Sequence, residues 1–268
     1  MAKILVRGRW VVGFNGQEHR VIPGGVVVFE GDTILHVGYR YSGTIDETID
    51  ASDKLIIPGL INAHLHTGHL GHSRVVSDHG RPEFFGAGYL NFSSPRREWL
   101  DRQPLPYAGA EMAALYTLAE LARSGTTTLV EIGGPASVLE AMVSAAGEIP
   151  LRCYLGPGFR SAEHYTDERG VMHLDWNEER GLAGLDAALR FIEKHEGAQD
   201  GRIRGILMPK EAGTCSEALL RRVAQASRET GLRRHIHAAE NLLEFHEVLR
   251  RTGMTPIQFL DSCGFLGP

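Results

Sequence analysis

The feature that most constrains the fold is a regular alternation of strand-like and helix-like segments from residue 58 onward. Apolar or β-branched runs predict strands at residues 59–64, 126–132, 150–156, 202–208 and 233–239. Apolar residues at helical spacing predict helices at residues 106–124, 137–147, 181–195, 215–231 and 241–253. Strands that alternate with helices form a parallel sheet, either open and doubly wound or closed as a (β/α)8 barrel. The sequence therefore predicts an α/β fold.

Two of these helices carry recognisable start or stop signals. Ser137, followed by Glu140 three positions later, has the pattern of a capping box at a helix start. Ser216 is expected to cap the fourth helix, and Gly231 is expected to end it.

Residues 1–57 have a different pattern and are expected to form strands. The β-rich runs lie at residues 3–8, 26–31 and 33–38. Gly31-Asp32 predicts a hairpin turn between the last two runs. Pro58-Gly59 has the composition of a boundary. We therefore expect two parts, residues 1–57 and residues 58–268, of which the first is too small to close a good core alone.

Composition excludes several classes of partner. The formal net charge is −5 and the 28 basic residues are spread along the chain, which does not favour nucleic-acid binding. Three distant cysteines form no CxxC pair, so neither a disulfide framework nor a cysteine-built zinc site is expected. No signal-peptide pattern, no run of roughly 18 apolar residues and no phosphate-binding glycine motif occurs. We expect a cytoplasmic protein that binds no membrane.

Two histidines stand at the end of the first strand of the alternating part. His64 and His66 are two positions apart, so both side chains project from the same face of a strand. Folds of this type place their chemistry at the carboxyl ends of the strands. Two neutral imidazoles on one face suit a divalent transition metal. The alternative is a chance pair on an ordinary surface.

A second cluster stands at the end of the fifth predicted strand. His237 offers an imidazole, and Glu240 offers a carboxylate that could move protons beside metal-activated water. His235 either shares the face of His237 or points into the layer below. Alone, such a cluster is more often an ordinary helix start, where Glu240 is favourable in the first turn. Together with the first pair, it predicts three imidazoles around one metal, as in catalytic zinc sites with an open position.

The long segment at residues 67–105 shows no clear periodicity, and loops of this length are usually functional lids or disordered. We expect a lid that selects the substrate. His69 and His72 within it could contact a substrate or simply be solvated. Glu131 and Arg160 are expected at the same end of the sheet, with no partner assigned. Four further histidines are expected on the surface: His164, His173, His195 and His246.

Three segments together resemble the amidohydrolase superfamily. They are "PGLINAHLHT" from residue 58, "YAGAEMAALYTLAELARSGTTTLVEI" from residue 107 and "TCSEALLRRVAQASRETGLRRHIHAAEN" from residue 214. The most similar branch holds cytosine deaminases and triazine hydrolases. The resemblance implies an N-terminal β-sandwich segment and a (β/α)8 barrel, here present as about five βα units. It also implies one divalent metal, zinc first and iron, manganese or cobalt as alternatives.

The resemblance assigns roles to four residues of this chain. His64, His66 and His237 would bind the metal, and Glu240 would be the proton shuttle. The reaction would be the attack of metal-activated water on an unsaturated carbon that carries a nitrogen or halide leaving group.

Lys210 departs from the pattern of that branch, which usually has a histidine at this place before Thr-Cys-Ser. A lysine cannot replace a neutral imidazole as an acceptor, so substrate recognition must differ here. Three interpretations remain for Lys210: a cation that contacts substrate, a carboxylated lysine that bridges two metals, or an exposed loop residue.

The family also takes a histidine from the sixth barrel strand and an aspartate from the eighth. Eight repeats of the size present here need more chain than follows residue 58, so we expect a product truncated before the sixth strand. The leading hypothesis is deamination of a nitrogen heterocycle, a small-molecule substrate. The alternatives are hydrolysis of an amide, urea or carbamate, and an inactive fragment or non-catalytic assembly protein. The resemblance suggests a homodimer.

Overall fold

The computed structural model describes residues 1–67, 109–166 and 172–267. The chain divides into two compact units, Met1–Leu60 and Ile61–Pro268. Each unit has its own sheet, and the two are described separately.

The first unit is one five-stranded sheet built around a long strand. Its strands are β1 (Lys3–Phe14), β2 (His19–Pro23), β3 (Val26–Glu30), β4 (Thr33–Gly38) and β5 (Glu47–Ile56). Strand β1 pairs antiparallel with β2 and β3 and parallel with β5. A register shift between Gly8 and Trp10 interrupts the pairing with β5, and a Cβ on Gly8 would come within 2.9 Å of the Ile56 side chain. The close approach of β5 therefore requires glycine there.

The hairpin predicted at Gly31-Asp32 is confirmed. Glu30 and Thr33 are paired across the turn between β3 and β4, and Gly31 has φ +60°, which glycine adopts without strain. Alternation along β1 and β3 sends Leu5, Val26 and Val28 into a small core.

The second unit contains a sheet in the order β13-β12-β8-β7-β6. Its strands are β6 (Leu60–Leu65), β7 (Thr126–Glu131), β8 (Arg152–Leu155), β12 (Ile203–Pro209) and β13 (Arg233–Arg234), and the short β9 (Gly158–Phe159) pairs with β12. The pairings of β7 with β8, β8 with β12 and β12 with β13 are parallel. A strand-helix repeat of about five βα units thus forms a partial (β/α)8 barrel, as predicted.

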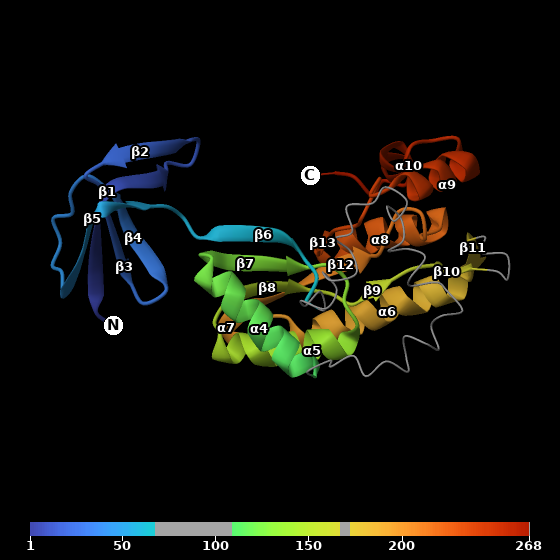
Figure 1. The fold of residues 1–268 in the computed structure, drawn as a ribbon, viewed down its shortest axis with the longest axis horizontal. Helices are drawn as coiled ribbons and strands as arrows, with labels where there is room; N and C mark the ends of the chain where they lie inside the picture. The colour runs from blue at the N-terminus through green and yellow to red at the C-terminus, as the bar shows by residue number, and fades with distance from the viewer. Residues whose placement is uncertain (68–108, 167–171, 268) are drawn as a thin grey trace. The chain divides into compact units, whose positions relative to one another are not determined.

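Helices follow the strands and cover the sheet (Figure 1). They are α4 (Ala110–Arg123), α5 (Ala136–Glu148), α6 (Glu178–His195), α7 (Ala198–Gly201), α8 (Glu217–Thr230), α9 (Leu242–Thr252) and α10 (Pro256–Ser262). Helix α4 contacts β7, α5 contacts β8, and α6 and α8 contact β12. Buried aliphatic side chains such as Leu129, Leu139, Leu207 and Leu219 form one core between the layers. No helix in the described part of the chain is long and apolar enough to cross a membrane.

The predicted cap and stop of α8 are confirmed, and the predicted capping box of α5 is wrong. The Ser216 hydroxyl accepts a hydrogen bond from the Leu219 N–H, and Gly231 ends α8 at φ +73°. Helix α5 instead begins at Ala136 after Pro135 and has no side-chain cap. Ser137 lies inside the first turn, where its hydroxyl cannot take the capping position.

Glu140 is paired outside its own helix. Its carboxylate contacts Lys194 Nζ at 2.8 Å and His195 Nε2 at 3.0 Å, both on α6. The expectation that His195 lies on the surface is therefore wrong, because this residue is 9% exposed.

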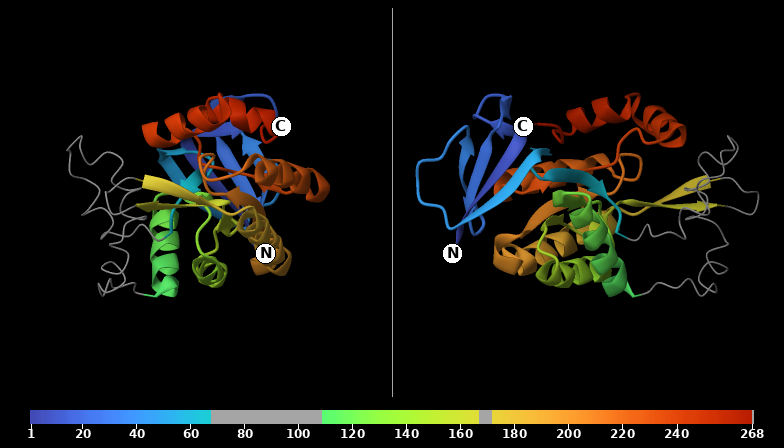
Figure 2. Two further views of the ribbon diagram at one scale, coloured as in Figure 1. Left: turned by 90° about the vertical axis from the view of Figure 1, so that its right-hand side faces the viewer. Right: turned by 60° about the vertical axis from the view of Figure 1, so that its left-hand side comes forward.

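The fifth strand is shorter than predicted, and a hairpin was not foreseen. Only Arg233–Arg234 of the predicted 233–239 form β13. Beyond it, single backbone hydrogen bonds join His235 N–H to the Leu207 carbonyl and His237 N–H to the Lys210 carbonyl. Strands β10 (Ala162–Thr166) and β11 (Met172–Trp176) form an antiparallel ribbon that projects beyond the sheet strands of this unit (Figure 2).

Candidate metal centre

His64 and His66 lie at the carboxyl end of β6. The strand geometry puts both imidazoles on one face, and their Nε2 atoms are 3.2 Å apart. Two nitrogen ligands at about 2.0–2.1 Å from a tetrahedral zinc ion are separated by a little over 3 Å. The spacing of this pair therefore suits one metal ion.

His237 reaches the same place from the segment after β13. Its ring centroid lies 5.0 Å from that of His64 and 5.3 Å from that of His66. One nitrogen of each of the three rings lies within 4.8 Å of the others. The donor set is three imidazoles with an open side, and it fits a divalent transition metal that retains a position for water or substrate.

The orientation of the His237 ring is set by a backbone carbonyl. Nδ1 of His237 lies 2.9 Å from the Lys210 carbonyl oxygen, which also accepts the His237 backbone N–H at 3.1 Å. A carbonyl only accepts, so Nδ1 carries the proton and Nε2 keeps its lone pair. This arrangement is the usual outer support of a metal-binding histidine.

His235 does not join the three-histidine group. Its ring centroid lies 6.5 Å from that of His64. Burial lowers the pKa of His235, and the nearby imidazoles of His64 and His237 lower it further. His235 is therefore a neutral neighbour of the cluster.

Glu131, at the end of β7, supports the turn that follows His66. Its carboxylate accepts the Thr67 N–H at 3.3 Å and the Gly134 N–H at 2.9 Å, and the residue is only 2% exposed. Burial raises the pKa of Glu131, although both hydrogen bonds and the charge of Lys210 act in the opposite direction. The side chain ties the loop after β7 to the loop after β6.

Lys210 follows β12 and is partly buried beside several charged groups. Burial, followed by the Arg160 guanidinium, lowers the pKa of Lys210, while Glu211, Glu163 and Glu131 raise it. A Cβ on Gly158 would stand 2.8 Å from Lys210 Cε, so the lysine side chain passes directly over that glycine. Lys210 is thus not an exposed loop residue.

Arg160 pairs with carboxylates beside Lys210. Its guanidinium is hydrogen-bonded to Glu163 and lies 3.8 Å from a Glu211 oxygen. The same Glu211 oxygen accepts the Thr214 hydroxyl at 2.6 Å. Within the described ranges, no carboxylate lies within ion-pair distance of the Lys210 ammonium group, in contrast to the Arg160 guanidinium.

Glu240 lies on the exposed turn between His237 and α9. Its backbone N–H donates to the Glu244 carboxylate at 2.8 Å.

His69 and His72, together with most of the expected lid, fall outside the described residues.

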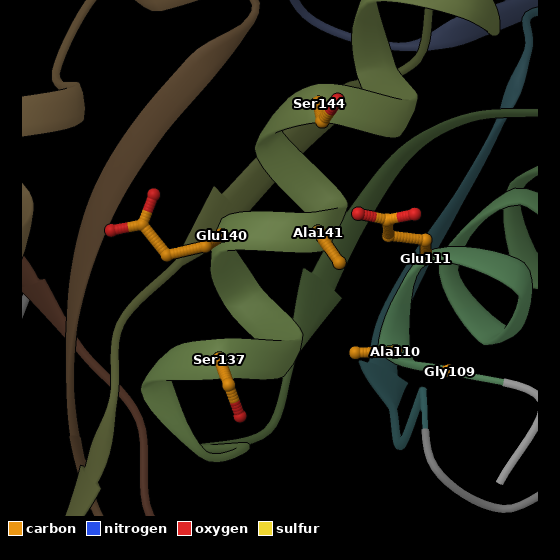
Figure 3. A pocket seen from close by; sticks show the side chains of 7 residues that line it. All are labelled: Gly109, Ala110, Glu111, Ser137, Glu140, Ala141 and Ser144. Atoms are coloured by element: carbon orange, nitrogen blue, oxygen red, sulfur yellow. The ribbon is translucent and has the colours of Figure 1, made fainter.

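A cavity between two helices does not belong to the candidate metal centre. A space of about 370 Å³ lies between the starts of α4 and α5, lined by residues that include Glu111, Ser137 and Glu140 (Figure 3). None of the predicted site residues lines it.

The contacts of two buried carboxylates, those of Glu131 and Glu244, were not predictable from the sequence. Glu131 was expected at the active end of the sheet, but no sequence signal identifies the N–H groups of Thr67 and Gly134 as its partners. Glu244 lies inside a predicted helix, where an acidic residue in the first turn is ordinary. The only signal in the sequence was that Glu244 lies four positions before Val248, on the face of the helix that is buried.

Residues 55–268 match the model of the Amidohydrolase family. The chain belongs to this family.

Two curated relatives illustrate the similarity. The chain is 28% identical over 268 residues to a 5'-deoxyadenosine deaminase of Methanosarcina barkeri, covering 100% of this chain and 56% of that protein. It is 32% identical over 243 residues to a 5-methylthioadenosine/S-adenosylhomocysteine deaminase of Archaeoglobus fulgidus, covering 88% of this chain and 50% of that protein. The chain thus spans about half the length of these relatives.

Solved structures show the same fold. A triazine hydrolase from Arthrobacter aurescens superposes with a TM-score of 0.75 at 25% identity, over 99% of this chain and 59% of that one. An adenosine deaminase from Xanthomonas campestris with bound zinc gives a TM-score of 0.71 at 20% identity, over 98% and 55%. The described residues of the second unit therefore have the fold of part of an amidohydrolase barrel.

Proposed function

We propose that this chain carries the metal centre of a hydrolase that acts on carbon–nitrogen bonds other than peptide bonds, and that it deaminates a nitrogen heterocycle. The observation that carries the proposal is the meeting of His64, His66 and His237, with one nitrogen of each within 4.8 Å of the others. Relatives named as deaminases of adenosine derivatives support the choice of reaction.

In this proposal the three imidazoles hold one divalent cation, zinc first. The cation supplies Lewis acidity toward water and substrate. The Glu240 carboxylate takes a proton from the attacking water and returns it to the departing nitrogen, which leaves as ammonia. The Lys210 carbonyl keeps the His237 ring in the tautomer that binds.

Lys210 contacts the substrate in this proposal, since its ammonium group has no carboxylate partner in the described part of the chain. His69 and His72 are proposed as further substrate contacts. A cation at this place also suits a substrate with a polar acyl oxygen. Hydrolysis of an amide, urea or carbamate is therefore the second candidate.

We further propose a cytoplasmic homodimer. The buried free thiols of Cys153, Cys215 and Cys263 support a reducing compartment. The proposal of a dimer rests on the family resemblance. Light scattering on the protein as it elutes from a size-exclusion column measures the molar mass that tests it.

The first test combines metal analysis with turnover. We expect about one zinc ion per chain and ammonia release from 5'-deoxyadenosine or 5'-methylthioadenosine, with triazines, N-acyl and carbamate compounds screened in parallel. His237→Ala should lose the metal. Glu240→Gln should keep it and lose roughly 100-fold or more in kcat.

The exposed His19 on β2 provides the matched control, because His19→Ala removes an imidazole remote in sequence from the cluster. It should change neither zinc content nor rate. A chain that binds zinc but turns over none of these compounds would favour the non-catalytic alternative. A chain that binds no zinc would refute the centre itself.

A further inference from the structure

Glu244 is an acidic side chain buried close to the proposed proton shuttle. It lies in the first turn of α9 and is 6% exposed. Its Oε2 atom accepts the backbone N–H of Glu240 at 2.8 Å. The helix itself is capped by Asn241, whose side chain accepts the Glu244 N–H at 3.0 Å. The carboxylate is therefore not needed for that cap.

A second helix of the same chain shows what an ordinary capping box looks like. In α10, Thr255 accepts the Gln258 N–H, and the Gln258 side chain accepts the N–H of Thr255, the capping residue itself. Glu244 occupies the position in α9 that Gln258 occupies in α10. Its carboxylate instead reaches one residue further back, to Glu240. The hydrogen bond is therefore made to Glu240, the residue proposed for proton transfer, and not to the capping residue Asn241.

The backbone before Glu240 needs such a restraint. Ala239 has φ +57°, a left-handed conformation that residues with a Cβ rarely adopt. On its other side the turn is fixed by the His237 carbonyl, which accepts the Ala212 N–H at 3.0 Å. The Glu244 hydrogen bond fixes the end of the turn that bears Glu240, so the strained conformation is held from both sides.

The surroundings of Glu244 are unfavourable for a carboxylate that only fills space. Burial raises the pKa of Glu244, and the charges of Glu211 and Glu240 raise it further, while the N–H groups of Glu240 and Gly213 lower it. A Cβ on Gly213 would lie 2.9 Å from Glu244 Cγ, so glycine makes room for the side chain. An apolar residue would fill this place at a lower desolvation cost.

We propose that Glu244 is a positioning residue that orients Glu240 for proton transfer by holding its backbone N–H. The inference rests on the proposed function for its catalytic consequence. The hydrogen bond itself can be tested without activity.

The test compares three substitutions of Glu244 in the whole chain loaded with zinc. Glu244→Gln keeps an acceptor oxygen at the same reach, Glu244→Asp keeps the charge but is too short, and Glu244→Ala removes both. We expect kcat to fall roughly tenfold in Ala and Asp, with KM and zinc content within about twofold of the wild type. The Gln variant should stay within about threefold.

Hydrogen exchange at the Glu240 amide is the readout that needs no substrate. We expect its exchange to accelerate roughly tenfold or more in Ala and Asp, and to stay near the wild-type rate in Gln. Glu247→Ala is the matched control on the same helix, because Glu247 pairs with the exposed Arg250 at 2.9 Å. It should leave both readouts unchanged.

The outcomes separate this inference from the proposed function. A wild type without turnover refutes the function, and the exchange pattern then still decides on the hydrogen bond. An unchanged Glu240 amide in Glu244→Ala overturns the inference. Equal losses of kcat in Gln and Ala, or loss of zinc in Glu244→Ala, also overturn it, because either result shows a structural role.

Discussion

At the scale of single residues, the ionisation of Glu131 has a measurable consequence. Burial raises the pKa of this carboxyl above its ordinary value of 4.5. For an acid with a raised folded pKa, the associated stability is complete below the unfolded pKa and is lost as pH rises through the folded pKa. The wild type should therefore lose stability relative to Glu131→Gln as pH rises from the ordinary value near 4.5 through the raised folded pKa.

Urea unfolding of both proteins at several pH values measures this difference. Glu111→Gln, on the exposed side of α4, is the matched control. A difference between the wild type and Glu131→Gln that stays constant over this range would show that burial does not alter the ionisation of Glu131.

Two cysteines should be chemically silent in the folded protein. Burial raises the pKa of the Cys153 and Cys215 thiols to about 12, so almost no thiolate is present at neutral pH. We expect neither to react with a disulfide reagent at pH 8 until the chain is unfolded in denaturant. Fast labelling of Cys215 in the native protein, detected by mass spectrometry, would contradict this expectation.

The residue scale also shows where sequence reasoning ends. The spacing of His64 and His66 puts two rings on one strand face, because a strand repeats every two residues. The contribution of the Lys210 carbonyl to His237 was not predictable, since it depends on how two strand ends meet in space. For the same reason Lys210 was left with three interpretations, and the exposed loop is the one that the structure excludes.

At the scale of elements, the caps of α5 and α8 offer a matched pair of substitutions. Ser216→Ala removes the hydroxyl that accepts the Leu219 N–H and should cost about 1 kcal/mol of unfolding free energy. Ser137→Ala removes a hydroxyl that caps nothing and should cost close to zero. Denaturant unfolding measures both, and equal costs would contradict the assigned helix starts.

The alternation of strands and helices was predictable because apolar periodicity follows directly from burial on a sheet or a helix face. The β10–β11 ribbon was missed because its strands carry charged and aromatic residues, as in "AEHYT" and "MHLDW", with no alternating apolar face. The fifth strand was predicted too long. After Arg234 the backbone makes only single hydrogen bonds, from His235 N–H to Leu207 and from His237 N–H to Lys210, and these do not form a continuous ladder.

At the scale of the whole molecule, metal binding should stabilise one part of the chain. A ligand at 100 times its dissociation constant adds about 2.7 kcal/mol to the unfolding free energy of the part that binds it. We expect zinc to protect the unit Ile61–Pro268 and to leave Met1–Leu60 unchanged. The proposed domains, residues 1–57 and 58–268, should behave in the same way.

Hydrogen exchange followed by mass spectrometry, with and without zinc, reads the two units separately. His64→Ala should abolish the protection. Equal protection of both units, or protection that persists in His64→Ala, would place the metal elsewhere.

The order of the strands shows that the histidine cluster draws its members from both ends of the sheet. Strands β6 and β13 are the two outermost members of their sheet, yet His64 and His237, about 170 positions apart in the chain, almost touch. An ion bound by both histidines would cross-link the first strand of this sheet to the last. It would thereby lower the conformational entropy of the chain between them. Removal of the ion should destabilise the two outermost strands, β6 and β13, while the pairing of the inner strands β7, β8 and β12 persists.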